Sequence, residues 1–183
     1  RNESSAASDV YKRQINEVFK ANKCIDVLIN NAGGAPLINS LDASMNFNNA
    51  IIDLNLNSSF TVSYYVAKKM IKKSSGCVIT NISSVTATRP TPGSAAYGAA
   101  KGGLVNLTKT LAVEWAPRIR VNSIITGYIE TENSLVHYGS KKDMKAVAKS
   151  IPMKRMGTPE DIANACIFLS SANSSWITGT AIE

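Results

Sequence analysis

Histidine and cysteine are scarce in this sequence. It contains a single histidine, His137, and three cysteines, Cys24, Cys77 and Cys166, which lie far apart and among apolar residues. A structural zinc site takes about four such ligands, and a disulfide framework takes cysteines in pairs. We therefore expect no metal centre and no disulfide, and we predict buried free thiols in a reducing compartment.

Long apolar runs are also missing. No uninterrupted apolar stretch approaches the roughly 20 residues of a membrane-spanning helix, and the first residues carry no hydrophobic signal core. Of the 183 residues, 44% are hydrophobic and 18% are charged, as in an ordinary folded domain. The sequence thus predicts one domain in the cytoplasm, without a membrane partner.

The formal net charge of +7 raises the question of nucleic-acid binding. Two sets of lysines gather on helix-like segments, and no aromatic residues alternate with them as they would in a single-strand binder. We interpret both sets as solvated helix faces and predict no nucleic-acid partner. The two sets are Lys68, Lys69, Lys72 and Lys73, and Lys141, Lys142, Lys145 and Lys149.

The first fourteen residues differ in character from the rest. The stretch Ser4–Gln14, SSAASDVYKRQ, resembles the translation of a transposase-type sequencing adapter. We predict that Arg1–Gln14 is a non-native segment and that native sequence begins near Ile15. The alternative is a genuine polar N-terminal tail.

After residue 15, short β-branched segments alternate with longer helical ones. This alternation predicts an α/β fold with a parallel sheet covered by helices. The strand candidates are Ile25–Asn30, Cys77–Ile82, Arg120–Ile125 and a strand that begins within Ile177–Glu183. The helical segments are Asn46–Lys73, Ala95–Trp115 and a helix that starts at Thr158-Pro159-Glu160-Asp161, with a capping hydroxyl, an early proline and two acids.

Tyr97 and Lys101 lie four residues apart in a predicted helix, and therefore on one face of it. The ordinary pKa of tyrosine, near 10, is too high for acid/base catalysis at neutral pH, and a neighbouring ammonium lowers it. Ser84, thirteen residues before Tyr97, follows the strand candidate Cys77–Ile82. Functional groups gather at the carboxyl ends of parallel strands, so we expect these three side chains to meet.

Two other positions point to the same edge of the sheet. Asn31-Ala32-Gly33 follows the first strand, and its small residues would let a ligand approach the backbone. Asn55 lies in the middle of a predicted helix, where its propensity is low. Taken alone, Asn55 is equally well explained as an exposed helix residue.

Together these residues resemble the short-chain dehydrogenase/reductase family in its single-domain branch. The resemblance implies a doubly wound, Rossmann-like parallel sheet and an NAD- or NADP-dependent oxidoreductase. Its reaction would be hydride transfer between nicotinamide and a small-molecule ketone or secondary alcohol. The similar blocks are Asp26–Gly33 (DVLINNAG), Asp53–Phe60 (DLNLNSSF), Asn81–Ser84 (NISS), Ala95–Leu104 (AAYGAAKGGL), Arg120–Thr131 (RVNSIITGYIET) and Pro152–Ala163 (PMKRMGTPEDIA).

The resemblance also implies roles for individual residues. Tyr97 would be the general acid/base, and Lys101 would lower the tyrosine pKa and hold the nicotinamide ribose. Ser84 would polarise the substrate carbonyl, and Asn55 would anchor a water in the proton relay. The remaining cofactor contacts would be Asn31, Ala32 and Gly33 on the adenosine side and Ile129 and Thr131 at the nicotinamide carboxamide.

The sequence also departs from the family pattern. The family's glycine-rich loop T-G-x-x-x-G-x-G has no counterpart before Ile15, so we expect the N-terminal strands to be missing. Residues 15–183 would then be a partial domain that carries the catalytic half. We expect this chain to be inactive by itself. Thr126 stands where the family usually has a proline, which predicts a looser loop at this position. His137 lies in Glu132–Ser150, which aligns with the family's variable substrate lid, and would contact substrate or solvent.

Other functions remain open from the residues alone. The main alternative is a non-catalytic relative that uses the fold for binding or regulation. An isomerase, epimerase or dehydratase of the extended branch would need a further C-terminal domain. The resemblance further implies a homodimer or homotetramer formed through Asn46–Lys73 and Ala95–Trp115.

Overall fold

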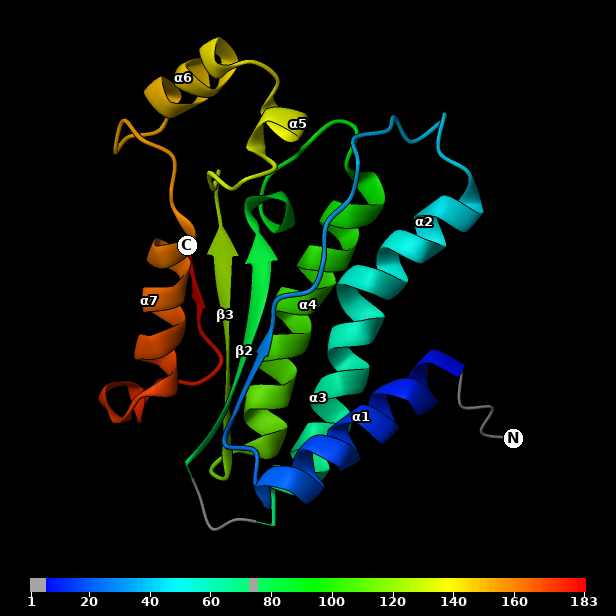
Figure 1. The fold of residues 1–183 in the computed structure, drawn as a ribbon, viewed down its shortest axis with the longest axis vertical. Coiled ribbons are helices and arrows are strands. Elements are labelled where there is room, and N and C mark those ends of the chain that lie inside the picture. Colours follow the sequence, from blue (N-terminus) through cyan, green and yellow to red (C-terminus); the bar gives the residue numbers. More distant parts are fainter. Residues whose placement is uncertain (1–5, 73–75) are drawn as a thin grey trace.

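A four-stranded parallel sheet forms the centre of the protein (Figure 1). The computed structural model describes residues 6–72 and 76–183. The strands pair in chain order, in agreement with the predicted parallel sheet. They are β1 (Val27–Asn30), β2 (Cys77–Ser84), β3 (Ile119–Thr126) and β4 (Ala181–Ile182).

Helices occupy the segments between and after the strands. The predicted helix Asn46–Lys73 is interrupted by a π-helical turn, η1 (Asp53–Asn57), and Lys73 itself lies outside the described residues. Short 3-10 turns follow β2 (η2, Val85–Ala87) and α7 (η3, Ala172–Ser174). The α-helices are α1 (Ala6–Asn22), α2 (Met45–Ile52), α3 (Ser58–Met70), α4 (Ala95–Trp115), α5 (Ser134–Tyr138), α6 (Lys141–Ser150) and α7 (Pro159–Ser170).

The sheet lies between two unequal layers of helices. Because side chains alternate along a strand, Ile79 and Val121 point into a core shared with α1, α3 and α4. Ile82 and Ile124 point the other way and pack against α7. Among the described helices, α7 is the one that Figure 1 shows on that second face, beside β3 and β4.

Strand β1 is an edge of the sheet, and its outer surface is poorly covered. Val27 and Ile29 are 40% and 44% exposed, although both are β-branched residues of a type normally buried in a parallel sheet. The expected unpaired apolar edge is therefore seen in the described residues.

Helix α7 begins as the sequence predicts. The Thr158 side chain accepts from the Asp161 backbone amide, the Asp161 side chain accepts from the Thr158 amide, and Pro159 occupies the first turn. Arg155 adds a two-pronged ion pair to Asp161, with N–O distances of 2.6 and 3.1 Å. This cap fixes the loop between α6 and α7.

Strand β4, Ala181–Ile182, begins within the predicted segment Ile177–Glu183. Before it, Gly179 turns with φ +76° and donates its amide to the Val121 carbonyl at 2.8 Å. The Thr178 hydroxyl accepts from the Val121 amide. The turn before β4 therefore forms the first hydrogen bonds to β3, and regular strand pairing with β3 is limited to Ala181–Ile182.

Helix α1 crosses the predicted junction at Ile15. Ile15 is buried in the main core, and the Ser8 and Tyr65 hydroxyls are 3.2 Å apart. Residues 1–5 lie outside the described part, and the adapter origin of Arg1–Gln14 stays a prediction.

The cysteines follow the sequence prediction in part. Cys77 and Cys166 are buried free thiols, whereas Cys24 is only partly buried because it lies in the connection between α1 and β1. Among residues 6–72 and 76–183, no group of three potential metal ligands comes together. Within the same residues, no helix combines the length and hydropathy needed to cross a bilayer.

Candidate active site

Ser84 and Tyr97 meet at the carboxyl end of the sheet. Ser84 is the last residue of β2, and Tyr97 lies in the first turn of α4. The connection through η2 turns the chain back, so that the Ser84 hydroxyl faces the Tyr97 phenol and acts to lower its pKa. Ser84 is buried and Tyr97 is half-buried, which leaves one side of the phenol open.

Lys101 lies one helical turn after Tyr97 and is almost fully buried, with 4% of its surface exposed. Its Nζ donates to the Ile82 carbonyl at 2.9 Å and lies 5.7 Å from the centre of the Tyr97 ring. Burial lowers the pKa of Lys101 to about 8, so the amine is still mostly protonated at neutral pH. A buried ammonium therefore stands beside the phenol.

The expected lowering of the tyrosine pKa is not seen. Burial raises the pKa of Tyr97 above its ordinary value, and the hydrogen bond with Ser84 opposes this only in part. The physical reason is the direction of Lys101, whose Nζ is bonded to the Ile82 carbonyl and lies over the ring. At neutral pH, Tyr97 is therefore a protonated donor.

Asn55 is completely buried, so the interpretation as an exposed helix residue is wrong. Its Nδ2 donates to the carbonyls of Ile51 and Gly34, both at 2.9 Å, and its Oδ1 accepts from the Gly34 amide at 2.8 Å. The π-helical turn directs Asn55 toward the segment after β1. Asn55 thereby clamps the backbone where the first strand ends.

Gly33 lies where Asn55 and Lys101 converge. A Cβ at this position would be 2.5 Å from Asn55 Oδ1 and 3.0 Å from Lys101 Nζ. Only a glycine leaves room for both polar side chains. The structure thus brings Gly33, Asn55, Lys101, Tyr97 and Ser84 into one continuous site.

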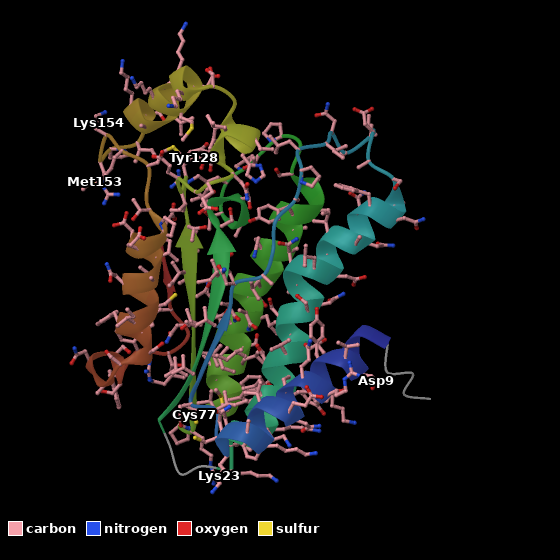
Figure 2. The ribbon with its side chains drawn as sticks, viewed as in Figure 1. Asp9, Lys23, Cys77, Tyr128, Met153 and Lys154 are labelled. Atoms are coloured by element: carbon pink, nitrogen blue, oxygen red, sulfur yellow. The ribbon has the colours of Figure 1, made fainter. Side chains whose placement is uncertain are left out.

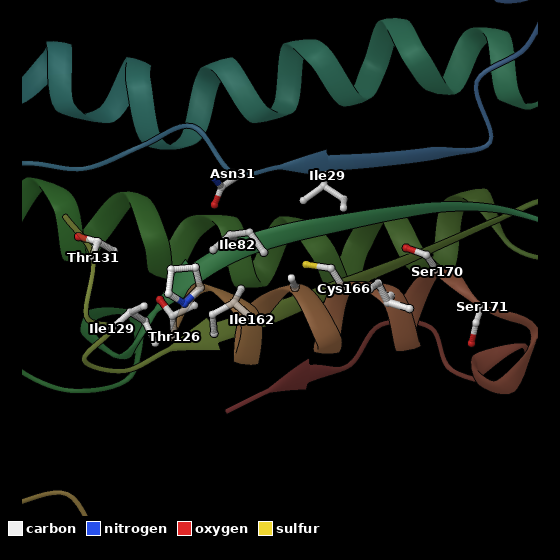
Figure 3. Close-up of a pocket in the computed structure, with 13 residues that line it drawn as sticks. Ile29, Asn31, Ile82, Thr126, Ile129, Thr131, Ile162, Cys166, Ser170 and Ser171 are labelled. Atoms are coloured by element: carbon white, nitrogen blue, oxygen red, sulfur yellow. The ribbon is translucent and has the colours of Figure 1, made fainter. Parts of the chain in front are cut away.

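A cavity of about 840 Å³ lies between the sheet and α7 and extends from Ile129 and Thr131, beyond the end of β3, along α7 to Ser170 and Ser171 (Figure 3). Of the predicted cofactor residues, Asn31, Ile129 and Thr131 line it. The lining does not include Ala32, Gly33, Tyr97 or Lys101. The other lining residues are largely apolar: Ile29, Ile82, Thr126, Pro159, Ile162, Ala163, Cys166, Ile167, Ser170 and Ser171. A flat aromatic ring fits such a lining, but no lysine or arginine lines it to neutralise a diphosphate.

The loop after β3 is well anchored, contrary to the looser loop expected from Thr126. The Thr126 hydroxyl donates to the Ser83 carbonyl at 3.0 Å, which ties the loop to β2. The Glu130 amide donates to the Gly157 carbonyl at 2.8 Å, and the Gly157 amide donates to the Tyr128 carbonyl at 2.9 Å. These bonds supply the rigidity that a proline would have given.

Tyr138 is a site residue that the sequence interpretation missed in favour of His137. His137 is exposed, whereas Tyr138 is half-buried and packs edge-on against Tyr128, with ring centres 5.9 Å apart. Burial, and then the neighbouring phenols Tyr128 and Tyr97, raise the pKa of Tyr138. The Ile129 backbone amide near its hydroxyl acts to lower its pKa. Figure 2 places Tyr128 just beyond the end of β3, below the lid formed by α5 and α6.

Residues 6–183 match the model of the family described as "Enoyl-(Acyl carrier protein) reductase". The chain is 37% identical over 178 residues to the 3-oxoacyl-[acyl-carrier-protein] reductase FabG of Chlamydia muridarum, covering 96% of this chain and 70% of that protein. It is 34% identical over 173 residues to dehydrogenase/reductase SDR family member 4 of Pongo abelii, covering 93% of this chain and 62% of that protein.

Solved structures show the same fold. The ligand-free aldohexose dehydrogenase of Thermoplasma acidophilum has a TM-score of 0.90 at 34% identity and covers 96% of this chain and 72% of its own. An NAD+-bound xylitol dehydrogenase has a TM-score of 0.88 at 27% identity, with 96% and 73% covered. An NADPH-bound variant of ElxO has a TM-score of 0.87 at 29% identity, with 96% and 71% covered.

Proposed function

Because the chain belongs to the short-chain dehydrogenase/reductase family of oxidoreductases, we propose that it serves hydride transfer between NAD or NADP and a small-molecule ketone or secondary alcohol. The observation that supports this most strongly is the assembly of Ser84, Tyr97 and Lys101 at the end of β2. Relatives with bound NAD+ and NADPH support the choice of cofactor.

Tyr97 is the proposed proton donor to the substrate oxygen during reduction. Its raised pKa keeps it protonated at neutral pH, and a positioned general acid contributes about 10²- to 10⁴-fold to a rate. The Ser84 hydroxyl donates to the same oxygen and stabilises the negative charge that develops there. The Ser84 hydroxyl lies close enough to the Tyr97 phenol to lower its pKa, which supports contact of both groups with one substrate oxygen.

Lys101 and Asn55 are proposed to supply the next proton. The Lys101 ammonium would hold the ribose hydroxyls of the nicotinamide nucleoside, and Asn55 would anchor a water beside it. Their convergence on Gly33 supports this pairing. When bound, the nicotinamide supplies the hydride itself.

The cavity fits the nicotinamide half of the cofactor better than the diphosphate. Ile129 and Thr131 are proposed to contact the carboxamide, and Asn31, Ala32 and Gly33 the adenosine side. The lining carries no cation, and the 183-residue sequence contains no T-G-x-x-x-G-x-G loop. We therefore propose that residues 15–183 are the catalytic half of the domain and that these 183 residues do not turn over alone.

Assembly and location also remain proposals. A homodimer or homotetramer would bury the exposed sides of α3 and α4, where Phe60, Tyr64 and Val113 are 45%, 43% and 81% exposed. The proposed location is the cytoplasm.

A chimera tests the proposed reaction. Two strand–helix units with the glycine-rich loop that the family resemblance implies would be taken from the 37% identical reductase and joined to residues 15–183. NADPH or NADH oxidation would then be followed with 3-oxoacyl thioesters and simple ketones. We expect turnover that falls at least about 100-fold in Tyr97→Phe and is unchanged in the control Tyr65→Phe, whose hydroxyl faces Ser8 and not the site. Full activity in Tyr97→Phe, or activity of the unmodified 183-residue chain, would contradict the respective proposal.

A further inference from the structure

Strand β2 holds Lys101 at both its side chain and its backbone. The side-chain Nζ donates to the Ile82 carbonyl at 2.9 Å, and the backbone carbonyl of Lys101 accepts from the Ser83 hydroxyl at 3.0 Å. Both bonds are buried, and Ser83 itself is 1% exposed. Two successive residues of the strand therefore fix the lysine, one through its ammonium group and the other through its main chain.

The bond from Ser83 comes in addition to the bonds of the helix that contains Lys101. Lys101 lies inside α4, and a carbonyl inside an α-helix accepts from the amide four residues later. A carbonyl oxygen has two lone pairs, so it can accept a second donor from outside the helix. The Ser83 hydroxyl is such a donor. It attaches the backbone of α4 to the strand whose next residue is Ser84.

A second polar bond attaches α4 to the same strand. Asn81 Nδ2 donates to the Thr108 hydroxyl at 2.8 Å, and both residues are buried. Asn81 precedes Ser83 on β2, and Thr108 lies about two helical turns after Lys101 on α4. Apolar packing between a helix and a sheet is not directional, whereas hydrogen bonds are. The two bonds together therefore fix the position of α4 along β2.

Ser83 also holds the loop that follows β3. Its carbonyl accepts from the Thr126 hydroxyl at 3.0 Å, and Thr126 lines the 840 Å³ cavity. One buried serine thus contacts both the helix that carries Tyr97 and Lys101 and the last residue of the neighbouring strand. Ser83 is therefore the residue at which the parts of the site are joined.

We propose that Ser83 is a positioning residue whose hydroxyl sets the register of α4 on β2 and so places Lys101 and Tyr97 beside Ser84. This rests on the proposed function, which makes those three residues the reacting groups. Ser83 is too deeply buried to touch the substrate. It acts through the main chain of Lys101.

Loss of the Ser83 hydroxyl has a consequence that can be measured at Lys101. The bond between Asn81 and Thr108 then remains, about two turns away, and α4 can move outward at Lys101. Outward movement brings water to the ammonium group. Burial is what lowers the pKa of Lys101 to about 8, so this pKa rises when the group becomes hydrated.

Titration of Lys101 by NMR, with isotope-labelled lysine Cε, tests the placement in the 183-residue chain. In Ser83→Ala we expect the pKa of Lys101 to rise by at least about half a pH unit, which is about a threefold gain in proton affinity. Ser83→Cys keeps a side chain of similar size with a weaker donor. It should raise the pKa in the same direction, and it serves if the alanine variant does not fold.

The matched control is Ser123→Ala. Ser123 is also a buried strand serine whose hydroxyl donates to a backbone carbonyl at 3.0 Å, but its acceptor is Asn81, within the sheet. Urea unfolding should show a similar loss of stability in Ser83→Ala and Ser123→Ala, because each loses one buried hydrogen bond. The pKa of Lys101 should change only in the Ser83 variants.

An unchanged Lys101 pKa in the Ser83 variants, or an equal rise in Ser123→Ala, would overturn the proposal. These titrations need neither cofactor nor turnover. Failure of the proposed reaction would appear in the chimera instead, as absent turnover with the Lys101 pKa still responding to Ser83. The two proposals can therefore fail separately.

Discussion

A methyl group added at Gly33 probes the packing that brings the site together. In Gly33→Ala the new Cβ would lie 2.5 Å from Asn55 Oδ1 and 3.0 Å from Lys101 Nζ. Asn55 cannot retreat freely, because it is fully buried and bonded to Gly34 through both its Oδ1 and its Nδ2. The substitution therefore displaces the side chain that clamps the end of β1.

The magnitude follows from the bonds that must break. Two hydrogen bonds to Gly34 are lost at about 1 kcal/mol each, and a buried amide left without a partner adds about 1 kcal/mol or more. We expect a loss of about 3 kcal/mol in the free energy of unfolding. For a chain of this size, that corresponds to a fall in Tm of roughly 6–12 °C.

Thermal and urea unfolding would measure the effect. The matched control is Gly127→Ala, because nothing lies within 4 Å of a Cβ at Gly127 and its φ is not in the left-handed region. The double variant Gly33→Ala/Asn55→Ala should lose less than the sum of the two single losses. A Gly33→Ala protein as stable as the Gly127→Ala control would refute the reasoning.

Three further predictions concern titration and thiol access. Because burial lowers the pKa of Lys101 to about 8 in the folded state, burying its charge costs stability at pH 7, and this cost is relieved as pH rises from 8 toward 10. In urea unfolding, the wild type should therefore gain up to about 1.4 kcal/mol of unfolding free energy per pH unit relative to Lys101→Met. A difference that does not change with pH would contradict this. The pKa of Asp161 is lowered to about 2, chiefly by its hydrogen bond from Arg155. The stability that this ion pair contributes is therefore present above about pH 4 and is lost as pH falls through 2. Unfolding of Asp161→Asn should depend less on pH in that range, and an acid profile identical to that of the wild type would contradict this. Disulfide reagents should modify the partly exposed Cys24 first and the buried Cys77 and Cys166 only on unfolding, and rapid modification of all three thiols would show that the core is open.

The strands could be predicted from the sequence because their apolar residues are continuous and β-branched. Even so, β2 and β3 are longer than predicted, since the polar residues Ser83 and Ser84 pair in register with Ile125 and Thr126. Pairing with a neighbouring strand, which local composition does not reveal, extends both strands to the site.

The π-helical turn and the lid could not be predicted in the same way. The pattern over Asn46–Lys73 is that of one helix, and only the distant bonds between Asn55 and Gly34 explain why the extra residue of η1 is accommodated. Tyr138 contacts Tyr128 and Ile129 because the loop after β3 folds back on itself. The motif residues were recognisable, but the direction of the Tyr97 pKa shift depends on burial in the folded protein.

Titration of Tyr97 by NMR, with its ring carbon labelled, tests the assembled site most directly. Because burial outweighs the hydrogen bond that Ser84 donates, we predict that the pKa of Tyr97 in the wild type is raised above the ordinary tyrosine value. In Ser84→Ala the pKa should be higher still, because that variant loses the hydrogen bond that opposes the effect of burial. A Tyr97 pKa that is the same with and without the Ser84 hydroxyl would contradict the account.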